Sequence, residues 1–307
     1  MAYGDYMTAK AQFPSEQSED GRFVRQEDQF HSWVSADGRS GFPAVANRYQ
    51  LFVSLACPWA HRTIIARKLL GLESAIDMTV VDPIRDERGW RYGSHFLSEL
   101  YVASDPAYRT RVTVPVLWDL QTKRIVNNSE DEIMRMFETE FGALGKGPDL
   151  YPVAYRTEID AMNEYIYDSL NDGVYKAGFA TSQPAYEEAA YAVFSALDQL
   201  DERLATRRYL FGSQPVETDW RLFVTLIRFD AVYVGHFKCN LRRIADYPNL
   251  YPYLRDLYQI PGIAATVDFD HIKRHYYSTH DDINPTRIVP IGPLQYLERP
   301  HDRERLG

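Results

Sequence analysis

The sequence predicts two domains, an α/β domain followed by an all-helical domain. Residues 46–142 show the pattern β-α-β and then, after a long insertion, β-β-α. A glycine-rich loop, Gly142–Pro148, follows, and apolar residues over 155–275 recur at helical spacing. The chain has 307 residues, enough for two domains of ordinary size. We expect irregular structure in residues 1–45 and a C-terminal tail over 276–307.

The first domain opens with an apolar run, Tyr49–Val53, that predicts a strand. A helical pattern begins at Pro58, where the missing N–H of proline is tolerated, and stops at Gly71. The other elements expected here are strands over 75–81, 116–118 and 124–126, an irregular stretch over 82–94, and a helix from Ser129. This order of elements resembles the thioredoxin-like half of a glutathione transferase.

The second domain is predicted to be entirely helical, because its apolar residues step by three and four. Val216 stands three positions before Asp219, at the spacing of a capping box. Valine has no side-chain oxygen, so we expect a weakly capped start for the helix that follows. The segments with helical spacing are 159–170, 190–204, 220–234 and 249–258.

Composition excludes several classes of protein. Only two cysteines occur in 307 residues, which argues against a disulfide framework and for a reducing compartment. No run of about 18 apolar residues exists, so no membrane span is expected. Residues 1–30 lack the features of a signal or transit peptide, which predicts a cytoplasmic protein. The net charge of −9 disfavours nucleic-acid binding. The eight histidines show no ligand spacing that predicts a metal site.

Cys57 lies where a strand should turn into a helix, directly before Pro58. Backbone N–H groups and the helix dipole favour a thiolate at such a helix start. A thiolate at this kind of turn is the attacking group of thiol-transfer enzymes. Trp59 and Ala60 occupy the positions where a dithiol motif would have its second cysteine, so Cys57 would act as a monothiol. The alternative is a buried cysteine that serves only packing.

Two further segments are candidates for binding a thiol ligand. Pro115 precedes an apolar strand, and in thioredoxin-like folds such a proline is cis and lies beside the cysteine, with the preceding residue offering its backbone. Ser129 and Glu130 open a helix, whose N–H groups can hold a carboxylate. The alternatives are an ordinary edge proline and a carboxylate that complements the helix dipole.

Trp90 and three tyrosines complete the set of candidate site residues. The indole N–H of Trp90 is a single donor for a ligand, although tryptophan in such a segment usually packs. Tyr175, Tyr233 and Tyr276 lie in the compact segments 173–176, 232–236 and 274–277. A phenol can exchange a proton with an enol or donate to a thiolate. By spacing alone, each of these tyrosines is more readily explained as structural.

The chain resembles the glutathionyl-hydroquinone reductases, the Xi class of the glutathione transferase superfamily, over nearly all of residues 20–295. Members of this family remove glutathione from glutathionyl-hydroquinones through a cysteine mixed disulfide, and a second glutathione then resolves that disulfide. The segments that carry the resemblance are Ser54–Arg62, Arg111–Asp119, Gly173–Ala180, Asp219–Phe223, Arg228–Asn240, Ala245–Leu250 and His271–Tyr277.

The resemblance implies roles for these candidates. Cys57 would be the nucleophile and Tyr175 the proton donor or acceptor on the hydroquinone. Tyr233 and Tyr276 would be the phenols that lower the pKa of the cysteine. It also implies a homodimer that meets through the helix beginning around 183–191, and a packed, structural Cys239. The residues implied to contact glutathione are Trp90, Arg111, Val112, Thr113, Val114, Ser129 and Glu130.

One departure from the family bears on the thiol cosubstrate. The family usually reads Asn-Glu-Ser where this chain reads Asn128-Ser129-Glu130. The cosubstrate could therefore be glutathione, γ-glutamylcysteine or another low-molecular-weight thiol. Two other classes of function also stay open, a non-catalytic thiol- or quinone-binding protein and a conjugating glutathione transferase.

Overall fold

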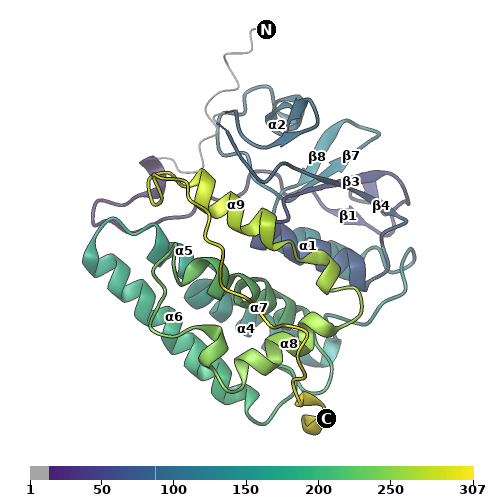
Figure 1. Cartoon of the computed structure of the whole chain (residues 1–307). Helices are drawn as coiled ribbons and strands as arrows, with labels where there is room; N and C mark the ends of the chain where they lie inside the picture. The colour runs from purple at the N-terminus through teal and green to yellow at the C-terminus, as the bar shows by residue number, and fades with distance from the viewer. Residues whose placement is uncertain (1–13, 87) are drawn as a thin grey trace. The chain divides into compact units, whose positions relative to one another are not determined.

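The computed structural model describes residues 14–86 and 88–307, which divide into two compact units (Figure 1). The first unit contains residues 26–148 and 266–289. The second contains residues 14–25, 149–265 and 290–307. The predicted change from an α/β region to a helical region near residues 142–155 falls close to the division at Pro148.

The first unit is built on a four-stranded mixed sheet in the order β4-β3-β7-β8. Strand β3 pairs parallel with β4 and antiparallel with β7, which in turn pairs antiparallel with β8. All four strands lie within two residues of the predicted bounds. The strands of this unit are β1 (Val34–Ser35), β2 (Phe42–Pro43), β3 (Tyr49–Val53), β4 (Ile76–Val80), β5 (Arg91–Tyr92), β6 (His95–Phe96), β7 (Val116–Asp119) and β8 (Arg124–Asn127).

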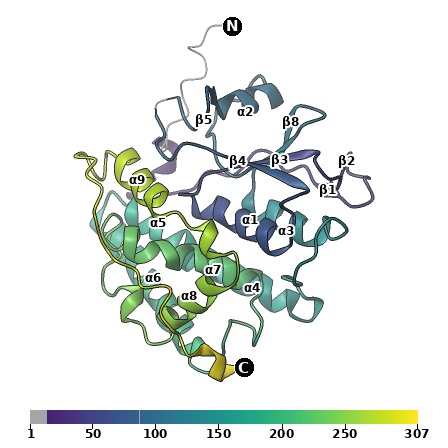
Figure 2. The ribbon, with the colours of Figure 1, turned by 45° about the vertical axis from the view of Figure 1, so that its right-hand side comes forward.

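Helices cover both faces of this sheet. Figure 2 shows α1 (Pro58–Leu69) and α3 (Glu130–Thr139) on one side and α2 (Ser98–Ser104) on the other. The hairpin β5–β6 and helix α2 lie in the insertion, where the sequence analysis expected an irregular stretch and no helix. Helix α2 has only 7 residues, too few for a clear helical period in the sequence.

The second unit is a helical bundle around α7 (Glu217–Arg228), all 12 residues of which are buried. A helix buried along its whole length has to be surrounded by other elements, and its polar residues, such as Asp219, need hydrogen-bond partners. The other α-helices of this unit are α4 (Arg156–Ile166), α5 (Gly173–Gly178), α6 (Gln183–Leu204) and α8 (Leu250–Gln259). The short 3₁₀ turns in the described part of the chain are η2 (Pro14–Glu16), η3 (Val153–Tyr155), η6 (Ile244–Asp246), η7 (Ala264–Thr266) and η8 (Arg303–Leu306).

Two of the predicted helices end in π-helical turns. The helix expected over 159–170 is α4 followed by η4 (Tyr167–Asn171), and the helix expected over 220–234 is α7 followed by η5 (Phe229–Tyr233). Apolar spacing of three and four does not distinguish these turns from α-helix. Such π-helical turns occur often at functional sites.

The start of α7 is better secured than the sequence analysis expected. Val216 supplies no capping oxygen, but the Asp219 carboxylate accepts the Val216 amide at 2.9 Å, the Leu210 amide at 2.9 Å and the Tyr253 hydroxyl at 2.7 Å. Three donors on one buried carboxylate stabilise the helix start without a capping residue. Val216 itself makes no side-chain capping bond, as expected, and two of the three donors to Asp219 come from other segments.

Helix α9 (Phe269–Thr279) crosses the predicted boundary between the helical domain and the tail at residues 275 and 276. It packs within the first unit. A ring nitrogen of His275 lies 2.9 Å from the carbonyl oxygen of Pro83, and Thr266, just before the helix, lies 2.8 Å from a ring nitrogen of His61. Part of the predicted C-terminal tail is therefore helical and belongs to the first unit.

Candidate active site

Cys57 ends the loop after β3 and occupies the N-cap position of α1, with Pro58 at the first helical position. Its backbone is extended (φ −76°, ψ 121°), and its carbonyl accepts the first helical hydrogen bond from the His61 amide at 3.0 Å. The side chain is half-buried and forms no disulfide. The predicted placement of Cys57 at the helix start is confirmed, and the positive end of a helix dipole favours a thiolate.

The Cys57 sulfur lies 3.6 Å from the carbonyl oxygen of Val114. The peptide bond between Val114 and Pro115 is cis, as the sequence analysis predicted. Pro115 directly precedes β7, a central strand, so the backbone of Val114 lies just before the start of that strand, beside the cysteine. The structure thus brings together two of the segments that the sequence singled out for thiol chemistry.

A buried polar network holds the segment 111–114 in place. The Tyr101 hydroxyl donates to the Thr113 carbonyl at 2.9 Å, and the Asn128 amide donates to the Thr113 hydroxyl at 3.1 Å. Burial raises the pKa of Tyr101, so its phenol stays protonated as a donor. The sequence analysis missed both Tyr101 and Asn128 as supports of the site, because their role depends on contacts with a distant loop.

Trp90 is 95% buried and stacks on His275 of α9, with ring centroids 4.9 Å apart and planes 22° apart. The Arg85 guanidinium carbon lies 5.5 Å from the Trp90 ring. His275 precedes Tyr276, which is fully buried in the same unit as Cys57. The structure therefore joins the predicted ligand-contacting Trp90 to the helix that carries the candidate phenol Tyr276.

The start of α3 faces α1 through a buried arginine. Ser129 is the N-cap residue of α3 and Glu130 its first residue. Nη1 of Arg62, which is fully buried on α1, lies 3.2 Å from carboxylate oxygens of both Glu130 and Asp131. The Ser129 amide donates to the Asn127 side chain at 2.8 Å. Arg62 thus ties the predicted ligand-binding helix start to the helix that Cys57 begins.

Glu130, largely buried at the start of α3, has a raised carboxyl pKa. Burial, and after it the nearby charge of Asp131, raise its pKa to about 7 against the opposing effect of Arg62. Glu130 therefore changes charge near neutral pH. A ligand ammonium beside this carboxylate would favour its ionised form.

In the second unit, Tyr175 and Tyr233 lie in one aromatic cluster. Tyr175 is on α5 and Tyr233 ends the π-helical turn η5, and their ring centroids are 6.2 Å apart. Phe237 stacks on Tyr233 at 5.5 Å with planes 10° apart, and it meets Tyr175 edge-on at 5.3 Å. Gly178 makes this approach possible, because a Cβ there would overlap the Phe237 ring. The two candidate phenols are thus held by one set of rings.

Cys239 has the structural role that the sequence predicted. It is fully buried in the second unit, and burial raises the pKa of its thiol to about 12. A thiol in this state is a poor nucleophile.

Within residues 14–86 and 88–307, no group of three or more His, Cys, Asp or Glu side chains is arranged to hold a metal. None of the helices in that same part of the chain has the length and hydrophobicity of a membrane span.

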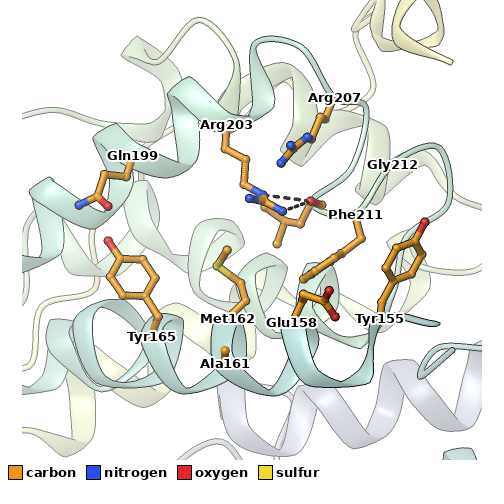
Figure 3. A pocket seen from close by; sticks show the side chains of 11 residues that line it. Tyr155, Glu158, Ala161, Met162, Tyr165, Gln199, Arg203, Arg207, Phe211 and Gly212 are labelled. Atoms are coloured by element: carbon orange, nitrogen blue, oxygen red, sulfur yellow. Dashed lines mark hydrogen bonds between the residues drawn. The ribbon is translucent and has the colours of Figure 1, made fainter. Parts of the chain in front are cut away.

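A pocket of about 660 Å³ in the second unit lies apart from these residues (Figure 3). None of the predicted site residues lines it, and one of its two arginines, Arg203, is committed to the carbonyl oxygen of Leu210 at 2.8 and 3.0 Å. Its walls come from α4, α6 and the loop after α6, and its lining residues are Tyr155, Glu158, Ala161, Met162, Tyr165, Gln199, Arg203, Arg207, Leu210, Phe211 and Gly212.

Family models and curated proteins that match this chain all point to the glutathione transferases. The family model for the glutathione S-transferase N-terminal domain matches residues 56–140, and that for the C-terminal domain matches residues 183–256. Glutathionyl-hydroquinone reductase YqjG of Escherichia coli (strain K12) is 53% identical, over 92% of this chain and 93% of that protein. Glutathionyl-hydroquinone reductase PcpF of Sphingobium chlorophenolicum is 47% identical, over 91% and 92% of the two chains.

Solved structures agree with the sequence comparison. The glutathione-bound structure of YqjG matches with a TM-score of 0.87 at 52% identity, over 93% of this chain and 98% of that one. The Xi class glutathione transferase from Natrialba magadii matches with a TM-score of 0.89 at 48% identity, over 94% and 96%. The predicted fold, a thioredoxin-like domain plus an all-helical domain, is confirmed. The chain therefore belongs to the glutathionyl-hydroquinone reductases, the Xi class of the glutathione transferase superfamily.

Proposed function

We propose that the protein is a thiol-dependent reductase that removes glutathione from S-glutathionyl hydroquinones. The observation that carries the proposal is the half-buried Cys57 sulfur at the start of α1, 3.6 Å from the Val114 carbonyl. The names of the relatives YqjG and PcpF support the same reaction. Nothing comparable supports Cys239, which is fully buried.

In the proposed reaction, the Cys57 thiolate attacks the thioether sulfur of the substrate. The new bond joins the two sulfur atoms, the carbon–sulfur bond breaks, and its electron pair goes to the ring. A second thiol then attacks the mixed disulfide and regenerates the Cys57 thiolate. Overall, the thioether-bound glutathione and one free glutathione thiol become one disulfide, and the hydrogen of that thiol is balanced by the one that the aryl carbon gains.

An aryl carbon leaves poorly unless the ring has first taken up a proton. We assign this proton transfer to Tyr175, which would protonate the carbon that bears sulfur while a ring hydroxyl becomes a carbonyl. Tyr233 and Tyr276 would stabilise the Cys57 thiolate by hydrogen bonds. The support is that Tyr175 and Tyr233 share one aromatic cluster, and that Tyr276 is buried in the same unit as Cys57.

Glutathione is the proposed cosubstrate, supported by the glutathione-bound structure of YqjG. The backbone of Arg111, Val112, Thr113 and Val114 would pair with it as a strand would, and Trp90 would donate its indole N–H. Ser129 and Glu130 would hold the glutamyl end, with the exposed amides of α3 facing its carboxylate. Since Glu130 already pairs with Arg62, γ-glutamylcysteine and other small thiols stay candidates.

We also propose a homodimer and a cytoplasmic site of action. The mechanism needs a reduced Cys57 and a supply of thiol, which the cytoplasm provides.

On the helix expected to form the dimer contact, Ala185 and Ala190 are buried within their own unit, whereas Tyr191 is 64% exposed. Any dimer contact through α6 would therefore use the Tyr191 face. A monomeric mass by light scattering at micromolar concentration would contradict it.

The test is a trapping experiment with glutathionyl-hydroquinone and no free thiol. Wild type should release hydroquinone once and retain glutathione on Cys57, seen by intact-protein mass spectrometry. Cys57→Ser should release none and retain nothing, and Cys239→Ser should behave like wild type. Release of hydroquinone by the Cys57→Ser variant would overturn the mechanism.

The same experiment separates the two alternatives. A conjugating transferase would form conjugates from glutathione and a quinone without any disulfide on Cys57. A binding protein would retain the substrate intact. In that case the alkylation rate of Cys57 against pH should resemble that of an ordinary cysteine, with a midpoint of about 8.5.

A further inference from the structure

The N-terminal segment 14–25 is irregular apart from the turn η2, as expected, but it packs as part of the second unit. The ring of Phe23, itself buried, lies 5.4 Å from the ring of Phe179, which follows α5. The Thr181 amide donates to the Gly21 carbonyl at 2.9 Å. These contacts fix the segment against the end of the short helix that carries Tyr175.

The exposed side of the segment is tied to the start of α6. Arg22 donates two hydrogen bonds to Glu188, at 2.7 and 2.8 Å, and the Ser182 hydroxyl donates to the Asp20 carbonyl at 2.7 Å. Gly21 has φ +86°, and a Cβ there would lie 2.9 Å from Ser182. Gly21 therefore fixes the segment against Ser182, and this contact sets the position of Arg25 four residues later.

Arg25, at the end of the segment, lies against Tyr175. Its guanidinium carbon is 4.8 Å from the centroid of the Tyr175 ring and 5.3 Å from that of Phe23. Its Nε donates to Asp172 at 2.6 Å. Asp172 directly precedes α5, three residues before Tyr175. One carboxylate therefore fixes the cation over the ring of the candidate proton donor.

The cation is charged although it lies in the interior. Burial on its own would lower the pKa of Arg25, but the charges of Asp172, Tyr167 and Tyr175 raise it above its ordinary value. A cation over the face of a phenol ring attracts the neutral ring. It attracts the tyrosinate more strongly, because the negative charge adds a Coulomb attraction.

Anchoring of the segment does not account for Arg25. Arg22 already anchors it at the surface, where the two side chains are 49% and 64% exposed. The pair of Arg25 and Asp172 is only 16% and 6% exposed, and burying such a pair costs desolvation that often cancels its attraction. A buried pair of this kind is weak evidence for a role in stability.

We propose that Arg25 is a positioning residue for Tyr175, holding its ring and stabilising the tyrosinate that forms when Tyr175 protonates the substrate ring. The destination of that proton rests on the proposed function. In this step the O–H bond of Tyr175 breaks and its electron pair stays on oxygen, while a C–H bond forms at the ring carbon that bears sulfur. The ring hydroxyl that becomes a carbonyl supplies the proton that restores the phenol.

The first test does not depend on any activity. With 3-fluorotyrosine placed at position 175 of the full chain, the ¹⁹F shift reports ionisation of that one phenol. Changing Arg25→Gln should move the titration midpoint to higher pH by about half a unit or more, since the stabilising charge is lost. Arg25→Lys should restore part of the shift, and Arg22→Gln should leave the midpoint unchanged. An unchanged midpoint in Arg25→Gln would overturn the proposal.

The second test uses two substrates, a glutathionyl-hydroquinone and the mixed disulfide of glutathione and 2-mercaptoethanol. The mixed disulfide has a thiolate leaving group and needs no ring proton. Arg25→Gln should lower kcat on the hydroquinone conjugate tenfold or more, leave KM within about twofold, and leave disulfide reduction unchanged. Combined with Tyr175→Phe, it should cost nothing further, because both changes remove one step.

The outcomes separate this proposal from the proposed function. An equal loss on both substrates would show that Arg25 serves only folding, and a full additional loss in the double variant would show that it acts apart from Tyr175. Either result overturns the proposal. If wild type reduces the mixed disulfide but never the hydroquinone conjugate, the proposed substrate is wrong, and the ¹⁹F midpoint alone decides the role of Arg25.

Discussion

The candidate residues of the two units are held in different ways. In the first unit, Cys57 is positioned by backbone, with a helix start on one side and the Val114 carbonyl on the other. In the second, Tyr175 and Tyr233 are positioned by neighbouring rings and by Arg25, whose partners lie about 150 residues away in the chain. Backbone geometry follows from local residue types, whereas ring packing depends on the whole fold. We therefore expect the position of Cys57 to tolerate changes elsewhere in the chain better than the position of the Tyr175 ring.

The largest effect expected is from Tyr175→Phe. Removing a general acid typically costs about 10²–10⁴ in rate, so kcat on a glutathionyl-hydroquinone should fall by that factor. Reduction of a glutathione mixed disulfide should stay near the wild-type rate, because its thiolate leaving group needs no ring proton. Cys57→Ser should abolish both reactions. If Tyr175→Phe lowers both equally, the division of labour between the two units is wrong.

The next largest effect is on the stability of the second unit. Asp219→Ala removes one carboxylate that accepts from Val216, Leu210 and Tyr253. It leaves buried donors without acceptors, which should lower the free energy of unfolding by about 3–5 kcal/mol. Urea denaturation monitored by circular dichroism measures this loss.

Asp246→Ala is the matched control for that measurement. Asp246 accepts the Arg243 amide at 3.1 Å at the start of the short turn η6, but it is exposed. It should cost less than about 1 kcal/mol. Similar losses for the two variants would show that burial does not decide the strength of these helix starts.

A smaller effect should come from Gly178→Ala, which probes the ring cluster directly. Alanine is normally preferred to glycine in a helix, yet here its Cβ would overlap the Phe237 ring. Displacing that ring should cost about 1–3 kcal/mol and lower hydroquinone turnover, because the ring contacts both Tyr175 and Tyr233. Gly142→Ala, with nothing within 4 Å of its Cβ, is the control. A stabilised and fully active Gly178→Ala variant would contradict the packing argument.

The smallest effect is a pH dependence of ligand binding at α3. The pKa of Glu130 is raised to about 7, chiefly by burial. Its carboxylate is therefore protonated below that pH and ionised above it. An ammonium ligand binds the ionised form, so affinity for S-methylglutathione should rise up to about tenfold from pH 6 to pH 8. This analogue has no thiol to titrate, and calorimetry measures its affinity.

Two variants check that assignment. Glu130→Gln should remove the pH dependence, and Asp131→Asn should shift it to lower pH, because the like charge beside Glu130 is gone. The same titration predicts a stability effect. A raised carboxyl pKa stabilises the fold below the unfolded value, near pH 4.5, and this contribution is lost as the pH rises through about 7. A pH dependence that survives in Glu130→Gln would assign it to another group.

Much of the first unit follows from local residue types. A proline after Cys57 makes a helix start there, and the apolar run Tyr49–Val53 makes the strand before it. Pro115 before an apolar strand indicated the cis bond that lies beside the sulfur. Each of these features depends on residues within a few positions of each other, so one sequence was enough to predict the helix start at Cys57 and to indicate the bond before Pro115.

Other features were decided only by tertiary structure. The sequence does not show that α9 returns to the first unit to stack His275 on Trp90, or that Arg62 joins the starts of α1 and α3. Nor does it show that an irregular N-terminal segment carries Arg25 to Asp172, which is 147 positions away. Such contacts join residues far apart in the sequence and depend on how the whole chain packs, so no local pattern of residues predicts them.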